Sequence, residues 1–276
     1  MIQSLEDRVR LSDGKSMPGF GFGCYNAHGA EITNAVRMAL ENGYRYIDSA
    51  AMYKNESEVG QGIRDSGVPR EKVFVLSKLW PTSYADVEKG TAEILENLGL
   101  EYVDCLLLHW PGRDEAVRLH AYEQLIAVRE KGLAGSIGVS NFDIPMVEAV
   151  MKQFGETPVM DELEQHPKYQ QTELVEFCHA HGMQTVAYSP IARGAYMDDP
   201  VVGRIAAAHG CTPTQVVLRW HIETGRIPIP KSTHENRIRE NADVFGFSLT
   251  AEELASLTAL ECGGRTGQDY RTFPQL

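Results

Sequence analysis

The sequence lacks the patterns that mark disulfide-stapled, metal-binding and membrane proteins. Its five cysteines are an odd number and none lies in a CxxC pair. No disulfide framework or zinc site is therefore predicted, and a reducing compartment fits best. No apolar run approaches the roughly 18 residues that a membrane span needs, and the first residues contain no apolar segment typical of a signal peptide. We expect a cytoplasmic protein without a membrane partner.

Basic residues are also scarce. The 26 Lys and Arg residues are outnumbered by 38 Asp and Glu residues, which gives a formal net charge of −12. This balance argues against non-specific binding to nucleic acid, although it leaves room for a local basic pocket that holds an anionic ligand. A GxGxxG segment after a strand is absent as well, so the usual dinucleotide fingerprint of an open α/β sheet is not predicted.

What the chain does contain is a regular alternation of strand and helix patterns. An Asp-Gly turn predicts a hairpin over residues 9–18, and eight strand-like segments follow it. The expected strands are 20–22, 44–48, 73–79, 103–109, 136–140, 159–163, 184–188 and 227–229. The expected helices are 31–42, 57–65, 85–98, 117–131, 145–154, 171–181, 201–209, 214–223, 236–245 and 251–260.

The number of units and the chain length decide between the α/β architectures. Strands such as 103–109 are nearly continuous apolar runs, as expected for a parallel sheet buried on both faces. Eight strand–helix units in 276 residues predict an α/β fold of the (β/α)8 TIM barrel type, with an N-terminal β-hairpin and two extra helices. We expect a single domain over residues 1–276, with the tail, residues 263–276, folded over the barrel mouth.

Polar side chains stand where several of these strands end. Asp48 ends the second strand, Lys78 lies near the end of the third and His109 ends the fourth. In a barrel these ends meet at one mouth, where such enzymes do chemistry. Lys78 lies among apolar neighbours and needs a nearby anion, for which Asp48 is the obvious candidate. Tyr53 lies on the loop after Asp48, and Asn55 is expected to cap the helix that follows.

These residues together predict acid–base chemistry. A cation close to a phenol stabilises the phenolate and lowers its pKa, so Asp48, Lys78 and Tyr53 make a plausible general acid, with His109 to orient a carbonyl. A structural interpretation stays open beside this one. Asp48 could cap a helix, Tyr53 could pack its loop, and His109 taken alone is more often a satisfied core histidine.

Five segments of the sequence carry a resemblance to a known family. They read GYRYIDSAAMYKNESEVG, LSKLWP, LLLHWP, IGVSNF and IPKSTHENRIREN. In this order they resemble the signatures of the aldo-keto reductase family, and the resemblance runs almost from end to end. The length and short tail look most like bacterial 2,5-diketo-D-gluconate reductase-type members. The resemblance implies NADPH-dependent reduction of an aldehyde or ketone to an alcohol on a (β/α)8 barrel.

The resemblance also implies roles for single residues. The family's catalytic tetrad falls on Asp48, Tyr53, Lys78 and His109. In that scheme a hydride passes from the nicotinamide to the carbonyl carbon, Tyr53 donates the proton, Lys78 paired with Asp48 lowers the pKa of Tyr53, and His109 orients the carbonyl oxygen. The implied cofactor contacts are Ser140, Asn141, Glu162, Tyr188, Ser189, Ile191, Arg193, Gly194, Lys231, Ser232, Thr233, Arg237, Glu240 and Asn241.

The positions near residue 231 also have a reading from their chemistry. A Lys-Ser-Thr run before a helix offers a charge, hydroxyl groups and free backbone N–H groups to an anion, as a nucleotide 2′-phosphate would need. The alternative is a capped helix with a solvated basic face.

One pair of residues departs from the family pattern. Family members usually carry Asn-Gln where this chain has Asp161-Glu162. An ionised Glu162 could still accept a hydrogen bond from the carboxamide NH2 of the cofactor. Its negative charge is expected to favour the cationic NADP+ ring over neutral NADPH. The alternative is that Glu162 turns aside to water.

The substrate is the least constrained prediction. Tyr25, Trp80 and Trp110 flank the catalytic strand ends and are expected to line a pocket that suits small carbonyls or keto-sugars. We expect a monomer with no metal. Two other functions stay open. One is a cofactor-binding barrel that acts as a regulatory or interaction subunit. The other is an unrelated barrel isomerase or metal-dependent hydrolase, which would need a metal cluster that His109 and Asp48 alone do not supply.

Overall fold

The computed structural model describes residues 1–272 and contains one small and one large sheet. The small sheet is an antiparallel hairpin of β1 (Arg8–Arg10) and β2 (Ser16–Pro18). The large sheet has eight strands, each hydrogen-bonded in parallel to its sequence neighbour. These are β3 (Phe22–Gly23), β4 (Tyr46–Asp48), β5 (Phe74–Leu79), β6 (Val103–Leu108), β7 (Ala134–Ser140), β8 (Met160–Glu164), β9 (Gln184–Tyr188) and β10 (Ile227–Pro228).

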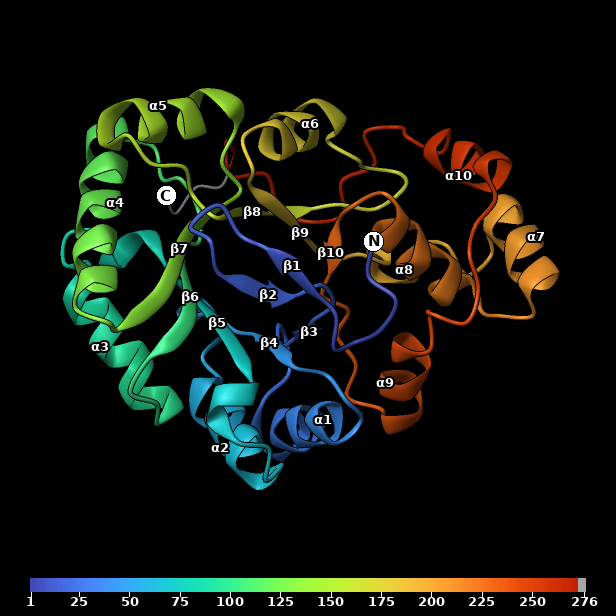
Figure 1. The fold of residues 1–276 in the computed structure, drawn as a ribbon, viewed down its shortest axis with the longest axis horizontal. Coiled ribbons are helices and arrows are strands. Elements are labelled where there is room, and N and C mark those ends of the chain that lie inside the picture. The colour runs from blue at the N-terminus through green and yellow to red at the C-terminus, as the bar shows by residue number, and fades with distance from the viewer. Residues whose placement is uncertain (273–276) are drawn as a thin grey trace.

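Helices surround this sheet, as Figure 1 shows. They are α1 (Gly29–Glu41), α2 (Glu56–Asp65), α3 (Val87–Leu98), α4 (Glu115–Glu130), α5 (Ile144–Phe154), α6 (Thr172–Ala180), α7 (Pro200–His209), α8 (Pro213–Glu223), α9 (Glu235–Ala242) and α10 (Ala251–Thr258). Two helices instead of one follow both β9 and β10, which accounts for the two extra helices. The predicted (β/α)8 barrel with an N-terminal hairpin is confirmed.

The ends of several helices are set by local sequence. The side chains of Asp86, Asp114, Asp143 and Asp199 each accept a backbone N–H at a helix start. Gly99, Gly155 and Gly210 take a left-handed conformation at helix ends. Such caps satisfy backbone groups that a helix leaves unpaired, so these boundaries could be read from sequence.

The barrel is closed where its first and last strands meet. The backbone N–H of Gly21 donates to the carbonyl of Pro228 at 3.0 Å, and that of Gly23 donates to the carbonyl of Pro230 at 3.2 Å. A Cβ on Gly23 would lie 2.9 Å from the backbone oxygen of Ile229. The first and last strands can approach this closely only because residue 23 is glycine. The first barrel strand begins at Phe22, two residues later than predicted.

The inner face of the barrel changes character along each strand. Successive side chains on a strand alternate between faces, so every second residue points inward. On the inner face, the apolar residues Leu76, Leu107, Met160 and Val186 form one cluster. The next inward residues toward the carboxyl ends are Lys78, His109, Glu162 and Tyr188. The interior of the barrel is therefore apolar in its middle and polar at the carboxyl ends of the strands. A functional site can form at that polar end.

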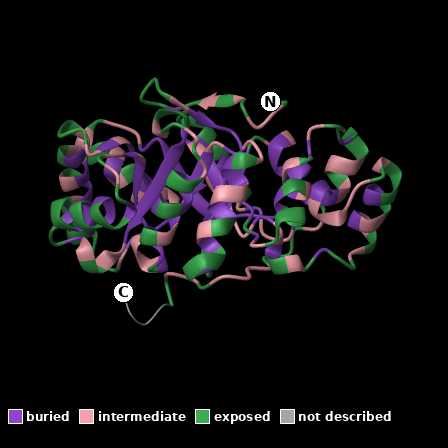
Figure 2. Cartoon of the chain, turned by 90° about the horizontal axis from the view of Figure 1, so that it is seen from below, coloured by how far each residue is buried: buried purple, intermediate pink, exposed green. Residues whose placement is uncertain are grey.

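The two ends of the barrel are covered by different segments. Leu11 and Met17 of the hairpin belong to the same apolar cluster as the barrel interior, so the hairpin plugs the amino end. Figure 2 shows the hairpin and the C-terminal segment on opposite sides of the buried strands. Residues 263–272 of the predicted tail contact the carboxyl-end side through Thr266, Gly267 and Tyr270. Residues 273–276 lie outside the described residues.

Candidate active site

The ammonium group of Lys78 is the centre of a cluster of polar side chains from two strands and a loop. Lys78 extends from β5, and its Nζ lies 2.6 Å from Oδ1 of Asp48 at the end of β4. The same Nζ lies 3.2 Å from the hydroxyl of Tyr53 and donates to the backbone oxygen of Ser49 at 3.0 Å. The side chains of Lys78 and Asp48 are 0% and 1% exposed, so bulk water does not screen this ion pair. The expected pairing of Lys78 with Asp48 is present.

The loop that carries Tyr53 is held by local contacts. Tyr53 ends a short 3-10 helix, and Lys54 after it has a left-handed backbone with φ of 53°. Asn55 occupies the cap position of α2, but its side chain does not cap the helix, contrary to expectation. Its Nδ2 instead donates to the carbonyls of Cys24 and Ala27 at 2.8 and 2.9 Å. Asn55 therefore ties the Tyr53 loop to the segment after β3, because buried carbonyls there need a donor.

The pKa of Tyr53 is set by burial as well as by the predicted effect of Lys78. Burial of Tyr53 raises its pKa above the ordinary value, and the nearby charges of Asp48 and Glu162 act in the same direction. Lys78 lowers the pKa of Tyr53, as expected, but it does not outweigh burial. Desolvation of the phenolate is the larger effect, so the net pKa is raised although Lys78 acts in the predicted direction. Tyr53 is therefore neutral and keeps a proton to donate.

His109 lies beside Tyr53 at the mouth of the barrel. Its ring centroid is 5.7 Å from that of Tyr53 and 5.2 Å from that of Trp80. Burial and then the charge of Lys78 hold the pKa of His109 well below its usual value. A neutral imidazole carries one N–H, and Nδ1 has no hydrogen-bond partner among the described residues. His109 is therefore a neutral group able to donate one hydrogen bond at the mouth.

Glu162 points into the same cluster and not to water. Its side chain is 1% exposed, and Oε1 lies 3.1 Å from Nζ of Lys78. The alternative in which Glu162 turns aside to solvent is therefore wrong. Burial raises the pKa of Glu162 well above its ordinary value, and the charge of Asp48 adds to the effect while Lys78 opposes it. Its neighbour Asp161 points to the other face of β8 and is also fully buried.

Three of the residues expected at the nicotinamide end lie together. Ser140 and Asn141 follow each other at the end of β7, and the hydroxyl of Tyr188 donates to Oδ1 of Asn141 at 2.8 Å. Nδ2 of Asn141 donates to Oγ of Ser140 at 2.9 Å and to the backbone oxygen of His109 at 3.1 Å. Both N–H groups of the Asn141 amide are therefore used within the protein. A carboxamide bound here would have to share or replace one of these partners.

The other expected cofactor residues form two groups. Ser189, Ile191, Arg193 and Gly194 lie on the loop after β9, where Ser189 and Arg193 have positive φ angles of 48° and 54°. The second group lies just before and along α9 and consists of Lys231, Ser232, Thr233, Arg237, Glu240 and Asn241. Within residues 1–272, Lys231 and Arg237 are exposed and have no ion pair or side-chain hydrogen bond.

The carboxylate of Glu240, one of the expected cofactor contacts, already accepts a hydrogen bond within the protein. Its Oε1 accepts from the hydroxyl of Thr212 at 2.8 Å, which links α9 to the start of α8. A contact between Glu240 and a nucleotide would therefore form beside this hydrogen bond to Thr212.

Aromatic residues line one side of the mouth. The ring of Tyr25 lies 5.1 Å from that of Tyr53, and the ring of Trp80 lies 5.5 Å from that of Trp110. Tyr25 is 51% exposed, whereas Trp110 is 8% exposed. The three residues expected at the substrate pocket therefore adjoin Tyr53 and His109.

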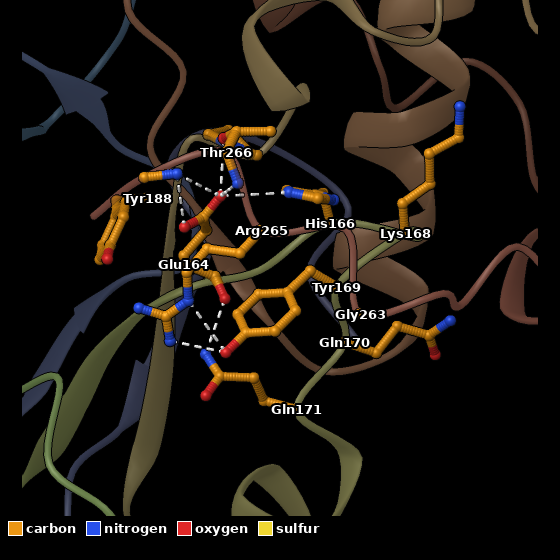
Figure 3. A network of polar contacts seen from close by, with 12 residues as sticks. Glu164, His166, Lys168, Tyr169, Gln170, Gln171, Tyr188, Gly263, Arg265 and Thr266 are labelled. Atoms are coloured by element: carbon orange, nitrogen blue, oxygen red, sulfur yellow. Dashed lines mark hydrogen bonds and ion pairs between the residues drawn. The ribbon is translucent and has the colours of Figure 1, made fainter. Parts of the chain in front are cut away.

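Sequence reasoning missed two groups around this site. Tyr46 donates its hydroxyl to Oδ2 of Asp48 at 3.0 Å, and the period of two along β4 is the signal that could have found it. The second is Glu164, shown in Figure 3, whose Oε1 accepts from the backbone N–H and hydroxyl of Thr266, both at 2.6 Å. His166 lies 3.3 Å from the same oxygen.

Glu164 thereby fastens the C-terminal segment to β8. Burial alone would raise the pKa of Glu164, but hydrogen bonds from His166, Thr266 and Gly267 outweigh burial and lower it to about 2. A Cβ on Gly267 would lie 2.8 Å from Oε2 of Glu164 and 3.8 Å from the Tyr188 ring. The tail segment therefore passes directly over the end of β8 and beside Tyr188. No signal in a single sequence links residues 164 and 266.

Two kinds of site can be checked against the described chain. Residues 1–272 contain no group of three or more His, Cys, Asp or Glu side chains placed to hold a metal ion. Over the same residues, no helix has the length and apolar character needed to cross a membrane.

The eight-stranded barrel, with its buried Lys-Asp pair beside a tyrosine at the carboxyl end, is the arrangement of a barrel enzyme built for acid–base chemistry. The family model described as the aldo/keto reductase family matches residues 21–261. The chain belongs to this family, and the resemblance seen in its motifs is confirmed.

Individual relatives agree with this assignment along the whole chain. The chain is 41% identical to a glyoxal reductase of Bacillus subtilis over 97% of each chain. It is also 41% identical to a 2,5-diketo-D-gluconic acid reductase B of a Corynebacterium species, over 97% of this chain and 98% of the relative. A solved aldo-keto reductase of Bombyx mori in complex with NADP superposes with a TM-score of 0.91 at 33% identity, covering 99% of each chain.

Proposed function

We propose that this protein reduces a small aldehyde or ketone to an alcohol with NADPH, and that Tyr53 donates the proton. The observation that carries the proposal is the hydroxyl of Tyr53 at 3.2 Å from the Lys78 ammonium, which is itself paired with Asp48 at 2.6 Å. These three groups lie at the carboxyl end of the barrel, where barrel enzymes place their chemistry.

The direction of the Lys78–Tyr53 hydrogen bond prepares Tyr53 as an acid. An ammonium group has no lone pair, so Lys78 donates and the oxygen of Tyr53 accepts. The proton of Tyr53 is then free to point at a carbonyl oxygen. When bound, NADPH supplies the hydride for the carbonyl carbon. As negative charge develops on the carbonyl oxygen, Tyr53 passes its proton to that oxygen, and Lys78 stabilises the phenolate that remains.

His109 and Asp48 position this chemistry. A neutral His109 donates a hydrogen bond to the carbonyl oxygen without adding a positive charge that would compete with Lys78. Asp48 holds Lys78, and Tyr46 in turn donates to Asp48 at 3.0 Å. The acid is therefore fixed in place through a chain of buried hydrogen bonds, which keeps the reacting geometry narrow.

The start of α9 fits the 2′-phosphate of NADPH. Lys231 and Arg237 are exposed cations that no carboxylate neutralises within residues 1–272. Ser232 is buried at this point, and its hydroxyl accepts the backbone N–H of His234 at 3.1 Å. Two unpaired cations beside a helix start favour a doubly charged phosphate. This arrangement supports a preference for NADPH over NADH.

The substrate class follows from the mouth and from the relatives. Tyr25, Trp80 and Trp110 form an aromatic wall beside polar groups, which suits a small carbonyl compound. The relatives named for glyoxal and diketogluconic acid act on compounds of that kind, so small dicarbonyls and keto-sugar acids are the proposed class.

The setting of the protein is part of the same proposal. All five cysteines are free, which suits a reducing cytoplasm. We expect a single-domain monomer, and light scattering on the purified protein checks this.

The experiment that tests the function is loss of NADPH absorbance with a panel of carbonyls. The panel contains glyoxal, methylglyoxal, diketogluconate, an aromatic aldehyde and a β-keto ester. Turnover of at least one carbonyl, with NADPH preferred to NADH, supports the proposal. NADPH binding without turnover of any carbonyl would favour the alternative of a cofactor-binding regulatory subunit.

A further inference from the structure

Two buried carboxyl groups share the single positive charge of Lys78. Asp48 and Glu162 come from β4 and β8, on different sides of the barrel, and lie 2.6 and 3.1 Å from Nζ. Both side chains are 1% exposed. If both carboxyl groups were ionised, the cluster would carry a net negative charge away from water, which is costly.

The hydrogen bonds around Lys78 favour a proton on Glu162. The ammonium has three N–H groups but faces four oxygens, on Asp48, Ser49, Tyr53 and Glu162. Oε2 of Glu162 has no partner within the described chain. Burial and then the charge of Asp48 raise the pKa of Glu162, against the opposing charge of Lys78. Without a ligand, the neutral cluster is therefore Asp48 ionised, Lys78 charged and Glu162 protonated.

The other titratable groups near Glu162 do not compete for this role. Those that face it or its cluster are Asp48, Lys78, Cys24, Tyr46, Tyr53, Cys105, His109 and Tyr188. Burial is the largest cause that raises the pKa of the three phenols and of the two thiols, so all five stay neutral. His109 is held neutral by burial and Lys78. The adjacent strand β7 has no titratable side chain. Glu164, two residues along β8, is held ionised by its own hydrogen bonds.

The nicotinamide ring must bind close to this cluster if the proposed function holds. A carbonyl oxygen that takes the proton of Tyr53 lies about 2.6–3.2 Å from its hydroxyl. The hydride-bearing carbon must come within about 3–3.5 Å of the carbonyl carbon. The ring is neutral in NADPH and carries one positive charge in NADP+. A protonated Glu162 leaves the cluster neutral beside NADPH, whereas an ionised Glu162 balances the NADP+ ring.

We propose that Glu162 keeps the buried site neutral in both oxidation states of the cofactor by holding a proton beside NADPH and releasing it to solvent when NADP+ binds. The inference rests on the proposed use of NADP(H). The O–H bond of Glu162 breaks, its proton leaves through the mouth of the barrel, and the carboxylate stays as counter-ion to the ring. No electrons move in this exchange. Glu162 is a positioning and charge-balancing residue, and Tyr53 remains the proton donor to substrate.

The test is a count of protons released on binding. The enzyme is titrated with NADP+ and separately with NADPH in weakly buffered solution with a pH indicator. Both nucleotides carry the 2′-phosphate, so its own titration cancels in the difference between them. We expect binding of NADP+ to release more protons than binding of NADPH. In the pH range in which Glu162 of the free enzyme is protonated, the difference should approach about one proton per site. In that range the affinity for NADP+ should rise by up to about tenfold per pH unit, and that for NADPH should not.

Two variants separate the charge effect from a structural one. In Glu162→Gln the extra proton release should disappear, and NADP+ should bind more weakly relative to NADPH. Asp161→Asn is the matched control, because it removes a buried carboxyl from the same strand but from the opposite face. It should release protons as the wild type does.

Several outcomes would overturn the inference. Equal proton release with both wild-type complexes would do so, as would an excess that persists in Glu162→Gln. If Glu162→Gln does not fold, the pH dependence of the two wild-type affinities decides alone, and parallel curves contradict the inference. Absence of binding by either nucleotide would overturn the proposed function and this inference with it, and is distinguishable from binding without the proton difference.

Discussion

Lys78 carries one positive charge and faces oxygens from four other residues. Its contacts with Asp48, Tyr53 and Glu162 lie between 2.6 and 3.2 Å. Burial alone would lower the pKa of Lys78, but the groups around it, Asp48 first among them, outweigh burial and hold it well above the usual value. The site is therefore organised by a cation that stays charged, and the neighbouring oxygens adjust to it.

The substitution Tyr53→Phe tests whether Tyr53 is the proton donor. The substitution removes the hydroxyl that accepts from Lys78 and leaves the ring against Tyr25 and His109. We expect the rate of carbonyl reduction to fall by roughly 10²–10⁴-fold, which is the usual contribution of a positioned acid. NADPH affinity, measured by fluorescence titration, should change little. A variant that retains the wild-type rate would exclude Tyr53 as the acid.

Arg237→Ala tests the proposed phosphate contact. Within the described chain Arg237 has no protein partner, so its loss should not disturb α9. A charge-assisted contact typically contributes about 1.5–3 kcal/mol, so NADPH should bind roughly 10–100-fold more weakly while NADH binding stays the same. Arg239→Ala is the matched control, because Arg239 lies on the same helix but pairs with Glu235. Equal losses for NADPH and NADH in Arg237→Ala would contradict the assignment.

At the scale of elements, the strands position the site through their shared register. Asp48 on β4 pairs in register with Leu76 on β5, which places Lys78 one inward step further along. Ser140 on β7 pairs with Glu162 on β8. Because the barrel closes at β3 and β10, β4 and β8 face each other across its interior. The distances between β4 and β8 at the barrel mouth therefore depend on the seam, which is the contact between β3 and β10 that closes the barrel.

Gly23→Ala tests the seam. The added Cβ would lie 2.9 Å from the backbone oxygen of Ile229, which cannot move without opening the closing hydrogen bonds. We expect the free energy of unfolding to fall by roughly 1–3 kcal/mol, as for other overpacked sites. Gly203→Ala is the control, since Gly203 lies in α7 with open space around it. There the free energy of unfolding should rise by roughly 0.5–1 kcal/mol, because alanine suits a helix better than glycine. Urea unfolding of both variants measures the difference, and a stable Gly23→Ala would show that the seam tolerates separation.

For the whole molecule, buried carboxyl groups make stability depend on pH. Asp161 is fully buried and neither oxygen has a hydrogen-bond partner of good geometry. Burial raises the pKa of Asp161 well above its ordinary value, although nearby backbone N–H groups of Phe142 and Asn141 oppose the effect. A carboxyl group whose pKa is raised by folding holds a proton in the folded state at a pH where the unfolded chain has lost it.

Asp161→Asn should therefore stabilise the protein above about pH 4. Asp161 in the unfolded chain loses its proton near pH 3.9. From there up to the raised pKa of the folded state, the wild type loses up to about 1.4 kcal/mol of stability per pH unit through this group. The neutral asparagine does not titrate, so the variant should unfold at a higher temperature than the wild type, by a margin that grows with pH and then levels off. A margin that is independent of pH would contradict the account. Thermal unfolding followed by circular dichroism at several pH values measures it.

The sequence alone was sufficient for the barrel, the hairpin and the pairing of Lys78 with Asp48. Strand and helix periods, glycine stops and strand-end polar residues are local signals, and eight units in one chain leave few architectures open. Only the tertiary structure decided three further features. They are the contact of Glu162 with Lys78, the hydrogen bonds between Thr266 and Glu164, and the raised pKa of Tyr53. These features join segments that lie far apart in the chain, and they depend on which charges are buried together and on how little water reaches them. A single sequence records neither the distances across the barrel nor the burial that sets the proton on each group.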